Sequence, residues 1–335
     1  MGVYILILIL SLFVALFGKN KAIYWGFFLF LMFISTFRGM EVGGDTGYYL
    51  SAFVDTDAVK GSTIKTYEFG YLFLNLIVYY FTHNYTVLLG VTSFLVLFPV
   101  FFFTPKYCKY YNVIVAFYVL LYNFNFSLCF VRQFIAISIL YVGYLMCAST
   151  HKKKYLFFSI IIATLFHQTS IALLILLPFV RKKRYNRELA SILIILSYFI
   201  GRLNLHIQVF HLYGITTLYS GILTGDMVFT INGLIMTIYF AYIAYICNED
   251  SFIMYTMMIG LLVFNMLVFN TNLSRLNWSM SIVQIIILGN MKLYPRFQKY
   301  AIIHKGLSYI YTITLYVVFL AADQGKILPY EFSFD

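Results

Sequence analysis

The dominant pattern in the chain is a series of apolar runs, each about 15 to 25 residues long or slightly shorter, separated by short polar segments. These runs lie at residues 3–17, 22–37, 67–82, 85–103, 113–124, 129–149, 155–166, 168–180, 189–201, 227–247, 252–270, 276–290 and 301–321. Because about 20 apolar residues span the hydrocarbon core of a bilayer as an α-helix, the pattern predicts membrane helices. A β-barrel would show short alternating segments instead.

The composition supports a membrane protein. Of the 335 residues, 62% are hydrophobic and 10% are charged, and the mean hydropathy is +0.87. A soluble domain with so few charged residues could not cover its surface. The first run lacks a basic start and a small-residue cleavage site, so it is predicted to be a retained helix and not a signal peptide. We therefore predict an all-α polytopic membrane protein that forms one integral membrane domain over residues 1–335.

The basic residues gather in particular loops between the apolar runs. These loops contain Lys19 and Lys21, Lys106 and Lys109, Lys152–Lys154, Arg181–Arg187, and Lys292, Arg296 and Lys299. The positive-inside rule places all of them on the cytoplasmic side. This distribution accounts for the net charge of +11, so the charge is no indication of a nucleic-acid partner.

Two segments must depart from a simple series of crossings. The chain must leave and return to the side of the basic loops within runs 155–166 and 168–180. These runs are therefore predicted to form two short half-helices that meet at His167-Gln168. The loop at residues 38–66 carries no excess of basic residues, so run 67–82 is predicted to be re-entrant or interfacial. The expected topology is then about 12 transmembrane helices, with both termini outside.

With this topology, the remaining ionisable residues collect on the outer face. Ionisable residues at membrane depth cost a few kcal/mol, so they tend to face a cavity and serve a function. Arg132, followed by Gln133, lies inside an otherwise apolar run. Arg38 and Arg275 lie at helix ends, where a side chain that reaches towards the interface is the structural alternative. The planar guanidinium of arginine suits phosphate oxygens, so these residues are candidates for anion binding.

Three further residues are candidates for acid–base chemistry or its support. His167 lies at the tip of the predicted hairpin, and histidine suits general-base work near neutral pH. Its structural alternative is a hydrogen bond within the broken turn. Asp45 and Glu41 follow Arg38 closely and are candidates either for a carboxylate base or for an ion-pair partner of Arg38. The Gly43-Gly44 pair between them predicts a tight turn.

The sequence contains no strong metal or cofactor motif. A D-x-D pattern at residues 55–57 is common by chance. His206 and His211 lack an evident third ligand. The four cysteines, Cys108, Cys129, Cys147 and Cys247, have no metal-ligand spacing and are expected to be buried thiols. We therefore expect no cofactor and a metal-independent reaction.

Five segments occur in an order that resembles a known family: "FRGMEVGGDTGYY", "VRQFIAISIL", "ATLFHQTSIALLIL", "NLSRL" and "LPYEF". The ordered set resembles the EpsG-like branch of the Wzy-type polysaccharide polymerases of bacteria, which polymerise O-antigen, capsule and exopolysaccharide repeat units. Arg38, Gly43, Asp45 and Tyr49 fit the family pattern in the first outer loop, with looser spacing between Arg38 and Gly43. This looser spacing puts a strict role for Glu41 in doubt.

The resemblance implies a glycosyltransferase at the outer face of the bacterial inner membrane. Its donor and acceptor would be glycans linked to undecaprenyl pyrophosphate in the membrane lipid, and a separate chain-length regulator protein is a further implied partner. On this basis, Arg132 and Arg275, with Arg38, are expected to bind the pyrophosphate, and Gln133 and Glu41 belong to the same substrate-binding set. His167 is expected to be the base, with Asp45 as its orienting group or as an alternative base.

Other functions stay open at this point. An O-antigen ligase would use the same lipid donor, but such ligases usually carry a large late outer loop, which this chain lacks. A flippase or transporter would need charged residues along a path through the membrane, whereas here they gather at one face. A scaffold without a site would leave Arg132 unexplained.

Overall fold

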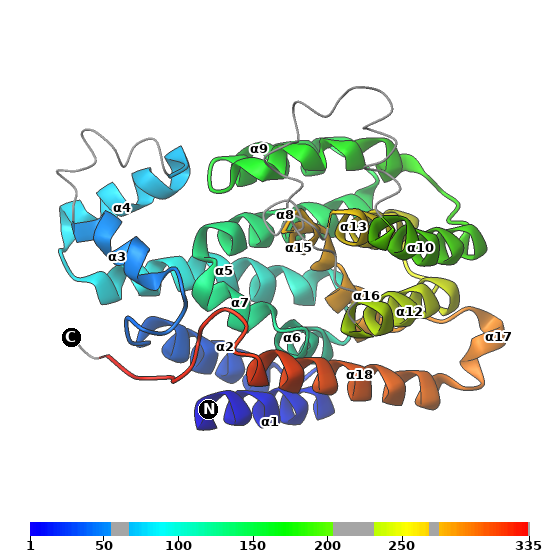
Figure 1. Ribbon diagram of the computed structural model, residues 1–335, viewed down its shortest axis with the longest axis horizontal. Coiled ribbons are helices and arrows are strands. Elements are labelled where there is room, and N and C mark those ends of the chain that lie inside the picture. Colours follow the sequence, from blue (N-terminus) through cyan, green and yellow to red (C-terminus); the bar gives the residue numbers. More distant parts are fainter. Residues whose placement is uncertain (55–66, 204–230, 268–274, 334–335) are drawn as a thin grey trace.

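The described part of the chain is entirely helical apart from loops and isolated bridges. The computed structural model describes residues 1–54, 67–203, 231–267 and 275–333, which contain sixteen α-helices and one 3₁₀ helix (Figure 1). The pairings of Arg38 with Phe332 and of Cys247 with Leu293 are isolated β-bridges within these residues. The predicted all-α class is confirmed.

Most helices coincide with the predicted apolar runs. They are α1 (Gly2–Leu16), α2 (Lys21–Thr36), α4 (Phe69–Phe81), α5 (Tyr85–Tyr107), α8 (Val131–Thr150), α9 (Lys153–Thr164), α10 (Arg187–Arg202), α12 (Ile231–Ile246), α13 (Ser251–Met266) and α18 (Ala301–Ala321). Four of these begin at a side chain that accepts hydrogen bonds from the first free backbone N–H groups: Asn20, Asn84, Asn186 and Asp250.

Two apolar runs are broken within their length. Run 113–124 becomes α6 (Tyr111–Leu120) and α7 (Asn123–Cys129), which are bent by 55° where Tyr122 adopts a left-handed φ of 64°. Run 276–290 divides into α15 (Leu276–Ser281) and α16 (Gln284–Asn290). Two short helices lie in segments for which no helix was expected: α3 (Thr46–Val54) and α17 (Pro295–Gln298).

Among the described residues, α5, α8 and α18 are long and apolar enough to cross a membrane, and the bent pair α6–α7 gives a fourth candidate span. Seven further apolar helices are shorter. The chain is thus a helical membrane protein, while the number of 12 crossings stays a prediction.

The hairpin predicted at His167 is present, but its second arm is not an α-helix. After α9, residues Gln168–Arg181 form the 3₁₀ helix η3, and His167 joins the two in an extended conformation. A 3₁₀ helix rises about 2.0 Å per residue, so these 14 residues extend about 28 Å, against about 21 Å for an α-helix. The stretched geometry brings this short arm close to the thickness of the hydrocarbon core.

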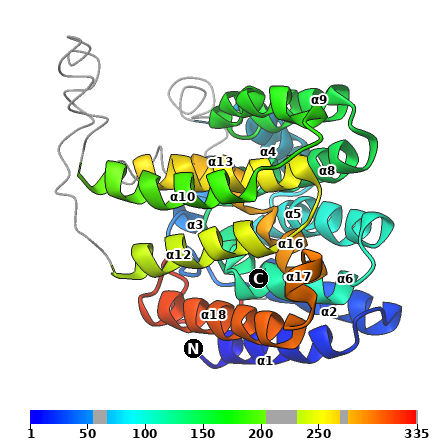
Figure 2. The same ribbon diagram turned by 90° about the vertical axis from the view of Figure 1, so that its right-hand side faces the viewer.

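The helices lie side by side between two ends with different chemistry. The N-terminus, α3, α4 and the C-terminal segment lie at one end, on the left of Figure 1. The loops of the opposite end, which faces the viewer in Figure 2, are joined by hydrogen bonds. Asn248 N–H donates to the Lys292 carbonyl, and Tyr255 Oη donates to the Arg184 carbonyl. We call the first of these ends the polar end and the second the basic end.

Helix α4 lies beside α3 at the polar end (Figure 1). Ring contacts connect Phe53 of α3 with Tyr79 and with Tyr85 at the start of α5. The outer side of α4 exposes large apolar side chains, including Phe69, Tyr80 and Phe81, as expected for a surface that contacts lipid. The predicted re-entrant or interfacial role of this segment agrees with its position and stays a prediction.

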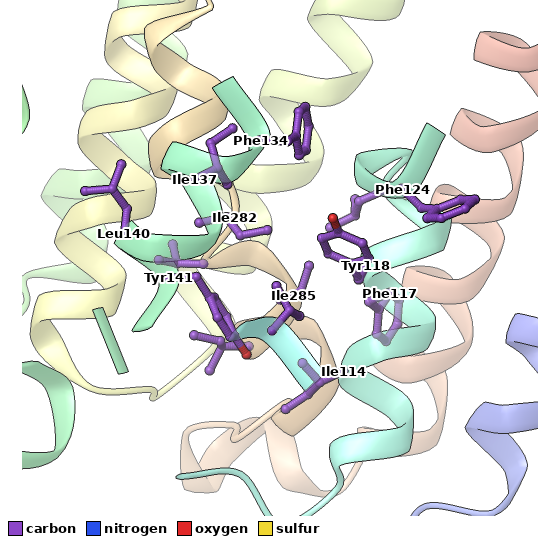
Figure 3. Packing of buried hydrophobic residues seen from close by; sticks show 14 of the residues in the cluster. Ile114, Phe117, Tyr118, Phe124, Phe134, Ile137, Leu140, Tyr141, Ile282 and Ile285 are labelled. Atoms are coloured by element: carbon purple, nitrogen blue, oxygen red, sulfur yellow. The ribbon is translucent and has the colours of Figure 1, made fainter. Parts of the chain in front are cut away.

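The core forms where α6 and α7 meet α8 and the pair α15–α16. Figure 3 shows buried side chains from these elements converging, with Tyr118 and Phe124 on one side and Phe134 and Ile137 on the other. Gly289 of α16 lies against Ile114: an added Cβ would lie 2.3 Å from Ile114 Cγ1. Because lipid is as apolar as the core, such close packing stabilises membrane helices more than the hydrophobic effect does.

Candidate active site

Three segments far apart in the sequence meet at Glu68 in the polar end. Glu68 immediately precedes α4, Arg132 lies in the first turn of α8, and His167 joins α9 to η3. Arg132 Nη1 forms an ion pair with Glu68 Oε2. His167 Nδ1 lies 3.4 Å from the other carboxylate oxygen, Oε1, which also accepts a hydrogen bond from Gln168 N–H at 3.3 Å. One carboxylate therefore holds both the predicted anion-binding arginine and the predicted base.

The surroundings of Glu68 keep it ionised. Burial alone would raise its pKa, but the hydrogen bond from His167, the charge of Arg132 and backbone N–H groups outweigh burial and hold the pKa at about 2. The carboxylate is therefore negatively charged at any physiological pH. A charged Glu68 favours a proton on His167 Nδ1, which leaves Nε2 as the basic nitrogen.

Aromatic rings enclose the guanidinium of Arg132. Its Cζ lies 4.7 Å from the ring centroid of Tyr67 and 5.8 Å from that of Tyr49. Tyr67 Oη donates to the Tyr48 carbonyl at 3.2 Å, which connects α3 to the start of α4. Stacking on aromatic faces restricts the arginine to one orientation.

Arg275, directly before α15, lies beside the same region. Gln133 Nε2 donates to the Arg275 carbonyl at 2.9 Å, so the residue following Arg132 fixes the backbone of the second arginine. The Arg275 guanidinium lies 4.6 Å from the ring centroid of Phe130 and 6.0 Å from that of Trp278. Among the described residues, no carboxylate forms an ion pair with it, so its charge remains available for an anionic ligand.

Asp45 lies near both arginines without an ion pair to either in the described ranges. Burial raises its pKa, and the charges of Arg275 and Arg132 oppose that rise. Burial therefore makes the carboxylate more basic than an exposed aspartate, while the arginines keep it accessible in its charged form.

The loop that carries Asp45 is fixed by a segment close to the C-terminal end of the described chain. Gly43 N–H and Gly44 N–H donate to the carbonyls of Lys326 and Gly325, both at 2.9 Å. Gly43 has a φ of +96°, and an added Cβ would lie 2.5 Å from the Leu128 carbonyl oxygen. The predicted tight turn at the glycine pair is therefore present at Gly43.

Arg38 is buried and has no hydrogen bond or ion pair to the other candidates among the described residues. Its side chain is 2% exposed, and Nη1 donates to the Ser35 carbonyl at 2.6 Å, while Nε and Nη2 have no partner among the described residues. It lines a cavity of about 10 Å³ together with Thr92 and Ser127, which is room for about one water molecule. Pyrophosphate binding by Arg38 would require its buried side chain to become accessible.

Glu41 is exposed, and no ion pair within the described residues joins it or Asp45 to Arg38. The D-x-D pattern at 55–57 and the pair His206 and His211 lie outside the described residues. In the part of the chain that is described, no group of three His, Cys, Asp or Glu side chains is placed to hold a metal ion. All four cysteines are buried and free, as expected.

Glu68 is the central residue that the sequence did not reveal as part of the site. The one indication of Glu68 in the sequence was that it is an acidic residue at the edge of an apolar run, where charged residues are scarce. Its partners lie 64 and about 100 positions later, so no local pattern could connect them.

A cavity of about 240 Å³ lies between helices, and part of its lining is Trp278, whose ring centroid lies 6.0 Å from the Arg275 guanidinium. Its lining is mostly aromatic and aliphatic and includes Phe126, Trp278 and Phe319. The polar side chains of Asn123, Asn277, Ser281, Gln284 and Gln324 complete it. The Phe126 and Trp278 rings stack with centroids 4.7 Å apart. A cationic group near a mostly apolar cavity suits an amphiphilic anion.

The model of the EpsG family matches residues 21–332, which covers nearly the whole chain. The chain therefore belongs to the EpsG family, as the resemblance predicted. Membership of this family indicates a role in polysaccharide biosynthesis. No functionally curated protein and no solved structure gives a match.

Proposed function

We propose that this EpsG-family protein is a polysaccharide polymerase that joins repeat units carried on undecaprenyl pyrophosphate, at the outer face of the bacterial inner membrane. The observation that carries the proposal is the cluster of Glu68, Arg132 and His167, with Arg275 and Asp45 beside it. This cluster combines a group for anion binding with a group for proton transfer, which a glycosyl transfer with a pyrophosphate leaving group requires.

In the proposed reaction, a hydroxyl oxygen of the acceptor sugar attacks the anomeric carbon of the donor glycan. The bond between that carbon and the pyrophosphate oxygen breaks, and the proton of the hydroxyl moves to a base. The leaving pyrophosphate gains negative charge as the bond breaks. Positive charge placed in advance at that position stabilises the transition state.

Arg275 is the principal group for the pyrophosphate in this proposal, because its guanidinium has no carboxylate partner among the described residues. Arg132 is already paired with Glu68, so it adds less net charge. Its planar fork still offers donors to phosphate oxygens, and the rings of Tyr49 and Tyr67 hold its orientation.

His167 is the proposed base, and Glu68 is a positioning residue that acts through it. With Nδ1 directed at Glu68 Oε1, Nε2 is the nitrogen that takes the proton. Asp45 is the alternative base, since burial raises its pKa. The two assignments differ in their dependence on Glu68, which faces His167 directly and can affect Asp45 only through Arg132.

The mostly apolar cavity that Trp278 lines is the proposed site for the first isoprenoid units of the lipid carrier. Trp278 connects Arg275 to the cavity, because it lines the cavity and its ring centroid lies 6.0 Å from the Arg275 guanidinium. A pyrophosphate bound at Arg275 would place its lipid tail over these rings. The carrier would then enter from the membrane and present its glycan to the polar end.

The first test is deletion of the gene in the native host, with surface polysaccharide analysed on a gel. Collapse of the ladder to lipid core plus one repeat unit supports a polymerase. Loss of attached glycan, with long chains still built on the lipid carrier, means a ligase. Loss of every lipid-linked unit at the outer face means a flippase.

The second test restores the gene with single variants. His167→Ala and Arg132→Ala should abolish long chains while the protein stays in the membrane. His151→Ala is a matched control, because His151 is an exposed histidine that lies near Asp250 at the basic end. Normal chain lengths in the His167 or Arg132 variant would contradict the assignment of that residue.

A further inference from the structure

A second amphipathic pocket lies away from the proposed active site, at the basic end between α6, α16 and α18. Its volume is about 170 Å³. Val113, Phe117 and Leu288 form an apolar wall, whereas Tyr110 and Lys305 bring polar groups to its rim. Nothing in the proposed glycan transfer uses this pocket.

Helix packing forms the pocket in advance. The Phe117 and Tyr309 rings stack with their centroids 5.0 Å apart, and both side chains line the pocket. Gly289 also lines it, and its lack of a side chain lets α16 approach Ile114 of α6. Ser308, also in the lining, already donates its hydroxyl to the His304 carbonyl at 3.0 Å. A ligand in this pocket would therefore make apolar contacts inside it and meet positive charge at its rim.

Three lysines provide that charge. Lys305 lines the pocket and is exposed. The ammonium groups of Lys19 and Lys109 lie 5.6 and 5.5 Å from the Tyr110 ring centroid. None of the three forms an ion pair within the described residues, and Glu249, which also lies at the basic end, is paired with Lys292. The rim is therefore a local excess of positive charge beside an apolar wall.

The depth of the pocket matches the boundary between lipid headgroups and acyl chains. Lys305 lies in the second turn of α18 and Tyr309 in the third. At about 1.5 Å per residue, Tyr309 lies about 12 Å along the helix from Ala301. The headgroup region and the first methylene groups of a leaflet occupy this range.

We propose that this pocket binds an anionic glycerophospholipid of the leaflet at the basic end. The phosphate lies beside Lys305, with Lys19 and Lys109 adding charge, and the start of an acyl chain lies against Val113 and Phe117. Basic pockets between membrane helices are suited to anionic headgroups, and tyrosine is favoured at this depth. The proposal does not depend on the proposed polymerase activity.

The test measures which lipid the purified full-length protein retains. The protein in mild detergent receives equal amounts of phosphatidylglycerol and phosphatidylethanolamine with identical acyl chains, and native mass spectrometry counts the bound lipids. We expect phosphatidylglycerol to be preferred. Lys305→Gln should reduce this preference about fivefold, because a lysine near an anionic headgroup contributes about that factor.

Two variants separate a specific pocket from general attraction by the basic end. Lys299→Gln removes an exposed charge at the same end, outside the pocket, and should leave the preference unchanged. Val113→Phe fills the apolar wall with the lysines intact and should reduce retention of both lipids. Equal binding of both lipids, or an unchanged preference in Lys305→Gln, would overturn the proposal. Displacement by inorganic phosphate at constant ionic strength would assign the pocket to a free anion and overturn it as well.

Discussion

At the scale of single residues, the feature with the clearest consequences is the carboxylate of Glu68. It binds Arg132 and faces His167, so its loss would leave two side chains without their common partner. The sequence identified Arg132 and His167 because charge and polarity are scarce in apolar runs. It could not identify their partner, since ion pairs between distant segments depend on the fold and leave no local pattern.

We predict that Glu68→Gln sharply reduces long-chain polysaccharide, with Glu188→Gln as the matched control, because Glu188 is an exposed glutamate that is paired with Arg187 outside the candidate site. The amide carries no charge, so Arg132 loses its ion pair and His167 loses the group that fixes its proton. Leaving such partly buried groups unsatisfied costs about 1–3 kcal/mol. The polysaccharide ladder, normalised to protein in the membrane, measures the effect. An unchanged ladder in Glu68→Gln would leave Asp45 as the better candidate base.

The depressed pKa of Glu68 also predicts a dependence of stability on pH. Its pKa is about 2 in the folded protein, against 4.5 for an unperturbed glutamate. A carboxylate with a lowered folded pKa stabilises the fold above its unfolded pKa, and this contribution is lost as the pH falls towards 2.

The difference in thermal unfolding midpoint between wild type and Glu68→Gln in detergent should therefore be constant above about pH 5 and shrink between about pH 4.5 and pH 2. A difference that is independent of pH over this range would mean that charge is not the basis of the stabilisation.

At the scale of elements, the apolar runs predicted most helices, because membrane helices need long apolar segments whatever their partners. The sequence predicted the break at His167 from the need to return the chain to the basic side. It could not predict that Gln168–Arg181 forms a 3₁₀ helix, since hydropathy does not distinguish the two helix types. It also missed α3, whose nine residues mix polar and aromatic side chains.

Gly43 and Gly44 allow a sharp test of the loop that carries Asp45. Gly43→Ala should destabilise the protein by about 2 kcal/mol or more and reduce polymerisation, because a positive φ costs a non-glycine residue about 1–2 kcal/mol. The new methyl group would also meet the Leu128 backbone. Gly44→Ala should have a small effect, because the nearest atoms belong to the flexible Lys326 side chain at 3.3 Å. Equal effects of the two variants would contradict this account.

At the scale of the whole molecule, the candidate site and the excess of basic residues lie at opposite ends. The positive-inside rule then predicts that the site faces outwards. The chain lies at the polar end both before and after α4. A count of apolar runs alone would instead make residues 67–82 cross the membrane.

Labelling of single cysteines with a membrane-impermeant maleimide tests this topology. The four native cysteines are buried, so they should contribute little background. Tyr48→Cys and His83→Cys, before and after α4, should both be labelled from outside intact cells, whereas Lys153→Cys should be labelled only after permeabilisation. Opposite accessibility of positions 48 and 83 would mean that residues 67–82 cross the membrane.

The hydrogen bonds from Gly43 and Gly44 to residues 325 and 326 also affect how the protein is made. Translation proceeds from the N-terminus, so the loop that carries Asp45 leaves the ribosome long before its partner segment exists. The backbone N–H groups of Gly43 and Gly44 therefore lack these partners until nearly all of the membrane helices have been inserted. A chain truncated before residue 325 would retain every helix of the described residues and still lack a finished site, so the site would be complete only when synthesis is almost finished.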